Sequence, residues 1–588
     1  MDGTVLPSLP ELRLHTPRDA IDAQGIVANW LAQLQKCFEE HVYDDMSHLF
    51  IDDCWWRDIL GLAWDFTTKQ GRDTIGAYLT SSEVSLEKLS PCTGGLKPAL
   101  VEWGEMAFVQ SGFIFGTRHG QGRGLVRLAH GADDTWKAWT VFTQLEELKQ
   151  SPLKHETTAV DGANSAAEDV VPVLIVGAGQ AGVMLGTRLR HMDVPVLLVE
   201  RHRAVGDAWR SRYDSVRLHT PKWTDHYPFL RYPDNWPEWL GRDRVADFLE
   251  HYAQLMDLDI MLGTSVTSVR RDGAKWAVEL YGPQGRRTIF PRHVVLATGV
   301  MSDEPNMPRF TGQDSFKGVV YHASQRKSGH QVPDVAAKSV VVVGCSTSGH
   351  DAAQDFVNCG AKQVSMVQRH PIFCVSSQSW KTMQLGLWNM EGLALDEADV
   401  LGNSFPTAVI RTMSIGLTAA MAEADAEMLD GLRRAGLAVR TGRDGYGLAD
   451  HQLIRGGHFY IDQGASGMIV DGRIRVHCCE GGVRELRERS VTLADGTELE
   501  ADVVVLATGY RKNIDHVRAL MGDEVADRLE GFGDLDGEQE RRGWWRPTGV
   551  EGFWYMTGSF MWCRQFSQAL ALQIAADLGR RVSPGGDA

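Results

Sequence analysis

The sequence predicts an α/β protein in which two parallel-sheet units follow a small α+β domain. Two observations predict the sheet units. The stretch 171–200 runs from an apolar strand through a glycine turn and a helix to a second apolar strand, and the stretch 340–369 repeats that order. A third observation predicts the α+β domain, because residues 1–150 combine helical periodicity with later strand-like runs. At 588 residues the chain is too long for one core, so two to four domains are expected.

The first glycine turn, Gly177-Ala178-Gly179-Gln180-Ala181-Gly182, has the spacing of a dinucleotide-binding loop. The first glycine permits the tight turn, the second lets the backbone approach a pyrophosphate, and the third lets the helix pack closely on the strand. The helix that follows presents free amides and the positive end of its dipole to phosphate groups. Glu200 ends the second strand, where a carboxylate can accept hydrogen bonds from ribose hydroxyls. We therefore predict a dinucleotide site at this turn.

The second turn, Gly344-Cys345-Ser346-Thr347-Ser348-Gly349, has a serine in place of the middle glycine. As the second copy in one chain, it still predicts a nucleotide site. The strand that follows it ends in Gln368-Arg369-His370, where an NAD site would show a carboxylate. A guanidinium can pair with a 2′-phosphate through two hydrogen bonds. The second site is therefore predicted to prefer NADPH over NADH.

Domain boundaries follow from these patterns. Residues 1–150 are predicted to form the α+β domain, and 151–170, poor in large apolar groups, a linker. One nucleotide-binding domain is predicted from 171–330 together with 475–588, and the other from 331–474. The latter carries an inserted segment that we expect to shape a substrate pocket or lid.

Residues 1–150 show one clear amphipathic helix, because Ile26, Trp30, Leu34 and Phe38 recur at helical spacing. A second helix is predicted at 73–79, and strands at 106–117, 124–129 and 136–145. Such a domain can form a ligand pocket, or it can be a packing or dimerisation module with aromatic residues in its core. The second interpretation is favoured, since function depends on sites and not on folds.

Composition excludes several classes of function. A formal net charge of -16 argues against nucleic acid as the main partner. No apolar run is long enough to span a bilayer, and the start Met1-Asp2-Gly3 does not resemble a signal peptide. The nine cysteines are scattered without a Cys-x-x-Cys pair, which favours reduced thiols and a cytoplasmic location. We expect no metal site, because no convincing cluster of metal ligands is visible.

The two glycine turns are accompanied by two Ala-Thr-Gly strand ends and by the connector Phe316-x-Gly318-x-x-x-His322. Together these motifs resemble the class B flavoprotein monooxygenases over about residues 171–580. Residues 1–150 resemble the SnoaL-like, cone-shaped head of fungal members of that family. The resemblance implies two Rossmann-like domains, the first binding FAD and the second NADPH. The implied FAD contacts are Gly177, Gly179, Gln180, Ala181, Gly182, Glu200, Arg201, Trp209, Ala297 and Gly299. The implied NADPH contacts are Gly344, Ser346, Thr347, Ser348, Gly349 and Arg369, and Gly509 of the second Ala-Thr-Gly segment is a further implied cofactor contact.

The implied activity is that of an NADPH- and oxygen-dependent monooxygenase. NADPH would reduce the flavin, oxygen would form a C4a-hydroperoxyflavin, and one oxygen atom would pass to a small organic substrate. Two alternatives stay open: an NADPH oxidase or FAD-dependent reductase that inserts no oxygen, and a ligand-binding protein with a vestigial flavin site. The missing Cys-x-x-Cys counts against a disulfide reductase. A homodimer is possible.

The chain departs from the family at two points. Arg326 stands where the family fingerprint ends in an aromatic residue, and the tryptophan of Baeyer–Villiger enzymes is missing there, which makes ketone-to-ester chemistry less expected. The family's asparagine near the flavin is not identifiable. His219 and Thr220 lie in roughly that region and are the catalytic candidates, although His219 fits a hydrogen-bonded structural histidine equally well.

Overall fold

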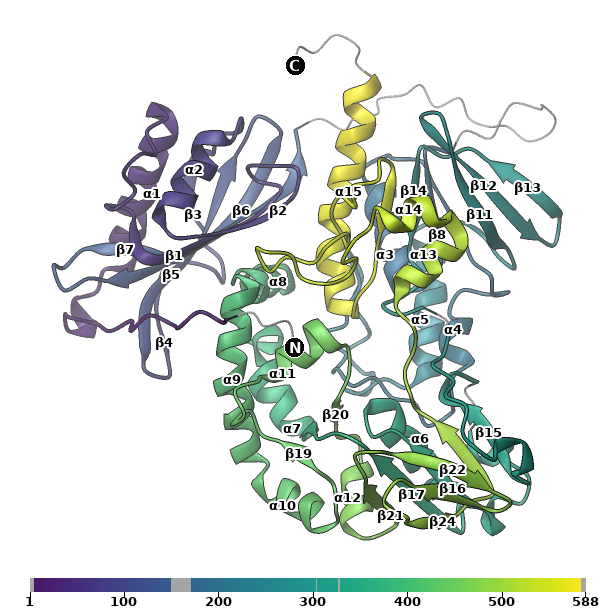
Figure 1. Ribbon diagram of the computed structural model, residues 1–588. Coiled ribbons are helices and arrows are strands. Elements are labelled where there is room, and N and C mark those ends of the chain that lie inside the picture. The colour runs from purple at the N-terminus through teal and green to yellow at the C-terminus, as the bar shows by residue number, and fades with distance from the viewer. Residues whose placement is uncertain (1–4, 150–170, 303, 326–327, 583–588) are drawn as a thin grey trace.

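The computed structural model describes residues 5–149, 171–302, 304–325 and 328–582 (Figure 1). The predicted linker 151–170 and Arg326 lie outside the described residues. Three bodies are visible in Figure 1: a head domain (residues 5–149), a first sheet domain (171–302 and 513–582) and a second sheet domain (304–511).

The head domain is one curled sheet with two helices on one face. The sheet has the order β2-β1-β7-β6-β5-β3, with β4 paired to β5, and only the β1–β7 pair is parallel within this sheet. The predicted helices and strands are confirmed, and the structure adds β1 and β2 ahead of the second helix and β3 and β4 after it. The elements are α1 (Ala23–Glu40), α2 (Arg72–Ser81), β1 (Phe50–Ile59), β2 (Phe66–Gln70), β3 (Glu87–Pro91), β4 (Ala99–Trp103), β5 (Met106–Gly116), β6 (Gly120–His130) and β7 (Trp136–Leu148).

Alternation along β1 divides the head domain into two faces. Trp56 points toward α1 and packs with Trp30 and Leu34 in the core of the head domain. Its neighbours Trp55 and Arg57 point to the other face of the sheet, yet both are buried. That face therefore packs against the rest of the chain.

The first sheet domain is built on a five-stranded parallel sheet of order β10-β9-β8-β14-β26. The helices α3 (Gln180–His191) and α15 (Phe560–Val582) pack together beside it. Its strands are β8 (Val173–Val176), β9 (Val196–Val199), β10 (Asp259–Met261), β14 (His293–Leu296) and β26 (Phe553–Tyr555), and a three-stranded antiparallel sheet of β11 (Ser265–Asp272), β12 (Lys275–Gly282) and β13 (Gly285–Ile289) is inserted before β14. The helices α4 (Asp207–Arg210) and α5 (Arg242–Leu255) precede that insertion, and α13 (Asn513–Met521) and α14 (Asp523–Asp527) precede β26.

The second sheet domain repeats this plan. Its parallel sheet has the order β21-β17-β16-β25-β15, so that the strand before the glycine turn lies in the centre as in the first domain. The strands are β15 (Val319–His322), β16 (Ser339–Val343), β17 (Gln363–Gln368), β21 (Ile474–Cys478) and β25 (Val503–Leu506), with α6 (Thr347–Asn358) after the turn and the small sheet β22 (Val483–Arg487), β23 (Ser490–Leu493) and β24 (Glu498–Glu500) inserted before β25. The same doubly wound order twice is the two-domain α/β fold that the sequence predicts.

Two sequence-based boundaries need correction. We predicted 475–588 as part of the first domain, but β21 and β25 pair within the second sheet, which therefore extends to about residue 506. β15 also belongs to the second sheet, although it precedes the boundary predicted at 330. Helix α12 (Ala465–Val470) directly precedes β21.

The inserted segment between β17 and β21 is largely helical. It contains the consecutive helices α9 (Thr407–Ala424) and α10 (Ala426–Arg434). Ahead of them lie α7 (Ser377–Ser379) and α8 (Leu395–Asn403), after them α11 (Leu448–Asp450), and a parallel three-stranded sheet joins β18 (Ile372–Val375), β19 (Val439–Arg440) and β20 (Phe459–Ile461). Within the described residues, no helix is long and apolar enough to cross a membrane.

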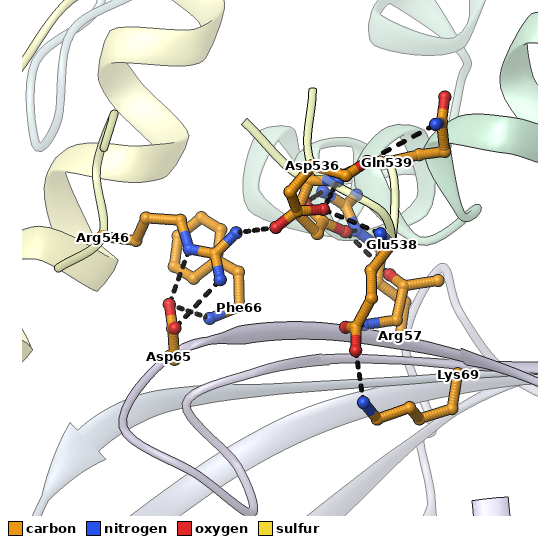
Figure 2. A network of polar contacts seen from close by, with 10 residues as sticks. Arg57, Asp65, Phe66, Lys69, Asp536, Glu538, Gln539 and Arg546 are labelled. Carbon is orange, nitrogen blue, oxygen red and sulfur yellow. Dashed lines mark hydrogen bonds and ion pairs between the residues drawn. The ribbon is translucent and has the colours of Figure 1, made fainter. Parts of the chain in front are cut away.

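The head domain binds the rest of the chain through a buried polar network (Figure 2). Arg57 of β1 donates two hydrogen bonds to Glu540, of 2.6 and 2.9 Å, and a third to the Asn403 carbonyl at 2.6 Å. Arg546 pairs with Asp65 at 2.6 and 2.9 Å. Apolar residues of the same face, including Phe66, join α15 in one hydrophobic core. The face of the head sheet that carries Trp55 and Arg57 is thus an intramolecular interface.

Candidate functional site

The first glycine turn borders a cavity of about 490 Å³ in the first sheet domain. The structure brings most of the predicted FAD-binding residues together around it. The predicted residues that line it are Gly177, Gly179, Gln180, Ala181, Glu200, Arg201, Trp209, Ala297 and Gly299, while Gly182 lies behind the turn. The volume lies within the usual range for ligand and cofactor sites.

Two of the three glycines of this turn are required by close backbone contacts, as the spacing predicts, and the third faces open space. Gly177 has φ +105°, and a Cβ there would lie 2.7 Å from the Ala297 carbonyl oxygen. A Cβ on Gly182 would lie 2.0 Å from the Gly177 carbonyl oxygen, so the helix can approach only without a side chain. A Cβ on Gly179 would meet no atom within 4 Å, because this residue faces the open cavity at the N-terminus of α3. A phosphate group fits this space.

Glu200 is held in place before any ligand arrives. Its carboxylate accepts hydrogen bonds from the backbone amides of Ala178 and His202, each of 2.9 Å, and its residue is buried. A carboxylate has about four acceptor positions, so two remain for ribose hydroxyls. Glu200 therefore both holds the glycine turn through the Ala178 amide and lines the cavity.

The far wall of the cavity comes from segments that sequence analysis did not single out. Thr557 and Gly558 precede α15, His516 and Leu520 lie on α13, and 264–266 begin β11. Gly558 has φ +132°, a backbone conformation that favours glycine. The glycine at this position is therefore the local sequence signal that could have pointed to the segment. Trp209 is nearly buried and stacks on Phe560 at a centroid distance of 5.9 Å.

The second glycine turn has the same geometry as the first. Gly344 has φ +116°, and its Cβ would lie 2.4 Å from the Ala507 carbonyl oxygen, while a Cβ on Gly349 would lie 2.0 Å from the Gly344 oxygen. Each glycine turn therefore packs against the alanine of an Ala-Thr-Gly segment. The hydroxyls of Ser346 and Thr347 both donate to the Phe459 carbonyl, at 3.2 and 3.1 Å, which places the insertion over this turn. Ser348 is exposed beside it.

Basic side chains gather at the end of β17, beside the second turn. Arg369 is exposed there, and the field of Arg455, His370, Arg440 and Arg369 adds to burial in lowering the pKa of His458. His458 also has φ +63°, in the left-handed region that only a few per cent of non-glycine residues adopt. Arg455 and His458 come from the insertion, and sequence analysis missed them because they lie far along the chain from β17. Arg440 is paired with Asp444 at 2.6 Å, and the positive charge of Arg369 and Arg455 fits a 2′-phosphate.

The two sheet domains are joined by paired connections that include the second Ala-Thr-Gly segment. Asn306 donates from its backbone amide to the Gly509 carbonyl at 2.9 Å, and Thr508 donates from its hydroxyl to the Asn306 carbonyl at 2.6 Å. The Tyr555 hydroxyl donates to the Gly299 carbonyl at 2.7 Å, which ties the first Ala-Thr-Gly segment to β26. The two connections therefore run side by side between the domains.

The two catalytic candidates lie outside the first cavity. His219 lines a separate cavity of about 720 Å³ between residues 214–244 and α6, where its Nε2 lies 3.5 Å from an Asp351 carboxylate oxygen. Thr220 donates its hydroxyl to Asp225 at 2.5 Å. Burial raises the pKa of Asp225 to about 6, and the hydrogen bonds from Thr220 and Thr224 oppose that rise. The structure therefore shows a structural partner for each candidate, and a catalytic role for either stays a prediction.

The segment that carries His219 is fastened to α6. Tyr213 donates its hydroxyl to Asp351 at 2.5 Å, and Ser215 donates to Asp355 at 2.7 Å. Since α6 begins at the second glycine turn, both domains meet at this cavity.

Among the described residues, no group of three or more His, Cys, Asp or Glu side chains could hold a metal ion. All nine cysteines are free, and burial raises the pKa of several of them, Cys345 to about 12. A thiol that stays protonated is a poor nucleophile, so this cysteine does not resemble a redox thiol.

Comparisons with known proteins agree with this geometry. Residues 174–388 match the family model described as pyridine nucleotide-disulphide oxidoreductase. The chain is 31% identical over 356 residues to the rice (Oryza sativa subsp. japonica) indole-3-pyruvate monooxygenase YUCCA1, covering 60% of this chain and 80% of that protein. It is 30% identical over 366 residues to YUCCA6 of Arabidopsis thaliana, covering 61% and 80%.

The fold is also found among solved structures. An open crystal structure of cyclohexanone monooxygenase superimposes with a TM-score of 0.51 at 17% identity, covering 70% of this chain and 88% of that one. At such low identity this likeness shows a shared fold alone. With the rice relative matched over most of its length, the chain belongs to the class B flavin monooxygenases, a family of FAD- and NADPH-dependent oxidoreductases.

Proposed function

We propose that this protein is a monooxygenase that holds FAD in the cavity of the first sheet domain, takes hydride from NADPH and transfers one oxygen atom to a small organic substrate. The observation that carries the proposal is the repeated turn geometry, in which each glycine turn packs on its own Ala-Thr-Gly segment and hydrogen-bonded connections join the two domains. Bound FAD supplies the redox and oxygen chemistry; the chain binds, orients and shields it.

The residues around the first cavity fit FAD. The open space at Gly179 and the first amides of α3 suit a pyrophosphate, and Glu200 offers acceptors to a ribose. Trp209 and the segment 557–558 close other sides of the same cavity. In the second domain, Arg369 and Arg455 supply positive charge for a 2′-phosphate, which supports NADPH as the preferred nucleotide.

The interdomain cavity is proposed as the route for substrate. It contains His219 and Asp351 and is lined on one side by Trp239. An imidazole held beside a carboxylate can accept or donate a proton at Nε2, which is one role for His219. The named relatives act on indole-3-pyruvate and, for the structural neighbour, on cyclohexanone. For this chain, 2-oxo acids, ketones and soft heteroatom compounds are the substrate classes to test first.

The rival proposal is an oxidase or reductase that uses the same cofactors without inserting oxygen. The two proposals differ in whether the site keeps water away from the reduced flavin long enough for oxygen transfer, and the test below distinguishes them. A cytoplasmic location and a homodimer remain predictions that fractionation and solution scattering test.

The test uses the purified holoenzyme. We expect a yellow protein with non-covalent FAD, and NADPH consumption that rises when a true substrate is added. With isotopically labelled oxygen, the product should gain one labelled atom for each NADPH consumed. Stoichiometric hydrogen peroxide with every substrate class, and no labelled product, would favour the oxidase or reductase. A colourless protein would favour the ligand-binding alternative.

A further inference from the structure

Trp545 has a backbone conformation that a large side chain rarely adopts. Its φ is +63°, in the left-handed region, although the residue is only 4% exposed. Such a conformation costs free energy and persists only where the surroundings hold it, and it recurs at functional sites. The contacts of Trp545 on its two sides show what holds it.

On one side, Trp545 supports a wall of the cofactor cavity. Its indole Nε1 donates to the Thr557 carbonyl at 2.6 Å, and its backbone amide donates to the Tyr555 carbonyl at 3.0 Å. Thr557 and Gly558 line the cavity directly. A Cβ on Gly558 would lie 2.9 Å from Trp562 and 3.5 Å from the Trp545 ring, so the wall has little room to shift toward the tryptophans.

On the other side, Trp545 is linked to the head domain. Its ring stacks on Phe566 of α15 at 4.1 Å with an interplanar angle of 10°, and Phe566 in turn contacts Phe66 of the head domain at 5.7 Å. The next residue, Arg546, donates two hydrogen bonds to Asp65 and one, of 2.8 Å, to Asp536 (Figure 2). A continuous set of contacts therefore runs from the head sheet to the cavity.

We propose that Trp545 is a positioning residue through which the docked head domain holds the Thr557–Gly558 wall against bound FAD. The head domain then has a role in cofactor retention, beyond that of a packing module, although none of its residues lines the cavity. This inference rests on the proposed function where it assigns the cavity to FAD.

The first test compares Trp545→Phe with Trp544→Phe in the full-length holoenzyme. The Trp545 variant keeps the aromatic stack and loses the bond to Thr557, whereas Trp544 makes no hydrogen bond from its Nε1 within the described part of the chain. FAD release into flavin-free buffer, followed by the rise in flavin fluorescence, should be about three- to tenfold faster for Trp545→Phe, the range that one net hydrogen bond gives. Trp544→Phe should release FAD within about twofold of the unaltered protein.

The second test addresses the head domain. Asp65→Asn removes the charge that Arg546 binds, and Asp52→Asn removes a charge that pairs with Arg72 at an exposed site within the head domain. We expect Asp65→Asn to speed FAD release and Asp52→Asn to leave it unchanged. The double variant with Trp545→Phe should be less than multiplicative, because both changes act on one set of contacts. Should Trp545→Phe fail to fold, this pair still decides the head domain's role.

Hydrogen exchange at the amides of 556–560 supplies a readout that needs no flavin. It should accelerate in Asp65→Asn and in Trp545→Phe but not in the two controls. Unchanged exchange and unchanged FAD release in both variants would overturn the inference while leaving the proposed function intact. A protein without flavin whose exchange still responds would contradict the proposed function and keep the mechanical link.

Discussion

Removing the guanidinium of Arg57 should lower the stability with which the head domain docks on the sheet domains. Arg57 and Glu540 have side chains only 5% and 3% exposed, and the pair is joined by two hydrogen bonds of 2.6 and 2.9 Å. In Arg57→Ala the Glu540 carboxylate keeps one side-chain partner, the Thr68 hydroxyl at 2.8 Å. Breaking a buried pair by removing one partner costs about 3–5 kcal/mol, most of it the penalty of the charge left behind.

The assay is chemical unfolding followed by tryptophan fluorescence and by far-ultraviolet circular dichroism. A chain of several domains does not unfold in one step, so the quantity to compare is the midpoint of the first transition, which we assign to head release. Arg57→Ala should lower it strongly. The double replacement Arg57→Met with Glu540→Leu should restore most of the loss, because an apolar pair of similar size is nearly neutral in such sites.

The control is the exposed pair of Arg18 and Glu102, whose side chains are 73% and 44% exposed. Breaking it should cost less than about 1 kcal/mol. An Arg57→Ala midpoint as close to the unaltered protein as that control would refute the reasoning, because it would mean that the head interface is open or hydrated in solution.

Three further outcomes are expected. Gly179→Asp places a carboxylate in the open space at the turn, so the variant should be purified without flavin; full flavin occupancy would contradict the placement of the site. Arg369→Ala and Arg455→Ala should each lower the NADPH-to-NADH ratio of kcat/KM about tenfold, as expected for a charge-assisted bond, whereas the exposed Arg434→Ala should not. Burial lowers the pKa of His350 to about 4, so the unfolded chain takes up a proton between pH 6.5 and 4 that the folded protein does not. Stability that is present above pH 6.5 should therefore fall toward pH 4. His350→Phe, which keeps a stacked ring, should reduce that fall in the free energy of unfolding by up to about 3 kcal/mol. An unchanged slope of the free energy of unfolding against pH would show that other groups cause the fall.

Much of the fold could be predicted from the sequence because its signals are local. The glycines at 177, 182, 344 and 349 are required by close backbone contacts, and each turn follows a buried strand, so the pattern and the geometry carry the same information. The acid of β9 and the arginine after β17 were predicted for the same reason. The structure adds that each turn packs on an Ala-Thr-Gly alanine, which explains why that motif occurs twice.

The parts that escaped prediction depend on long-range contacts. β1 is buried on both faces, so its sequence lacks the alternation of an exposed strand, and its burial requires Glu540, nearly five hundred residues away in sequence. The strand β21 was assigned to the wrong sheet because no local sequence pattern indicates which strands pair with each other. Thr557, Gly558, Arg455 and His458 reach their sites only through the folding of distant segments.

The most direct measurement mixes NADPH-reduced holoenzyme rapidly with oxygen and follows flavin absorbance. If the chain is a monooxygenase, an absorbance band between those of reduced and oxidised flavin should appear and last longer with NADP⁺ than without it, because a closed site keeps water away. Immediate return of the oxidised spectrum, with one hydrogen peroxide per flavin and no effect of NADP⁺, would contradict the account.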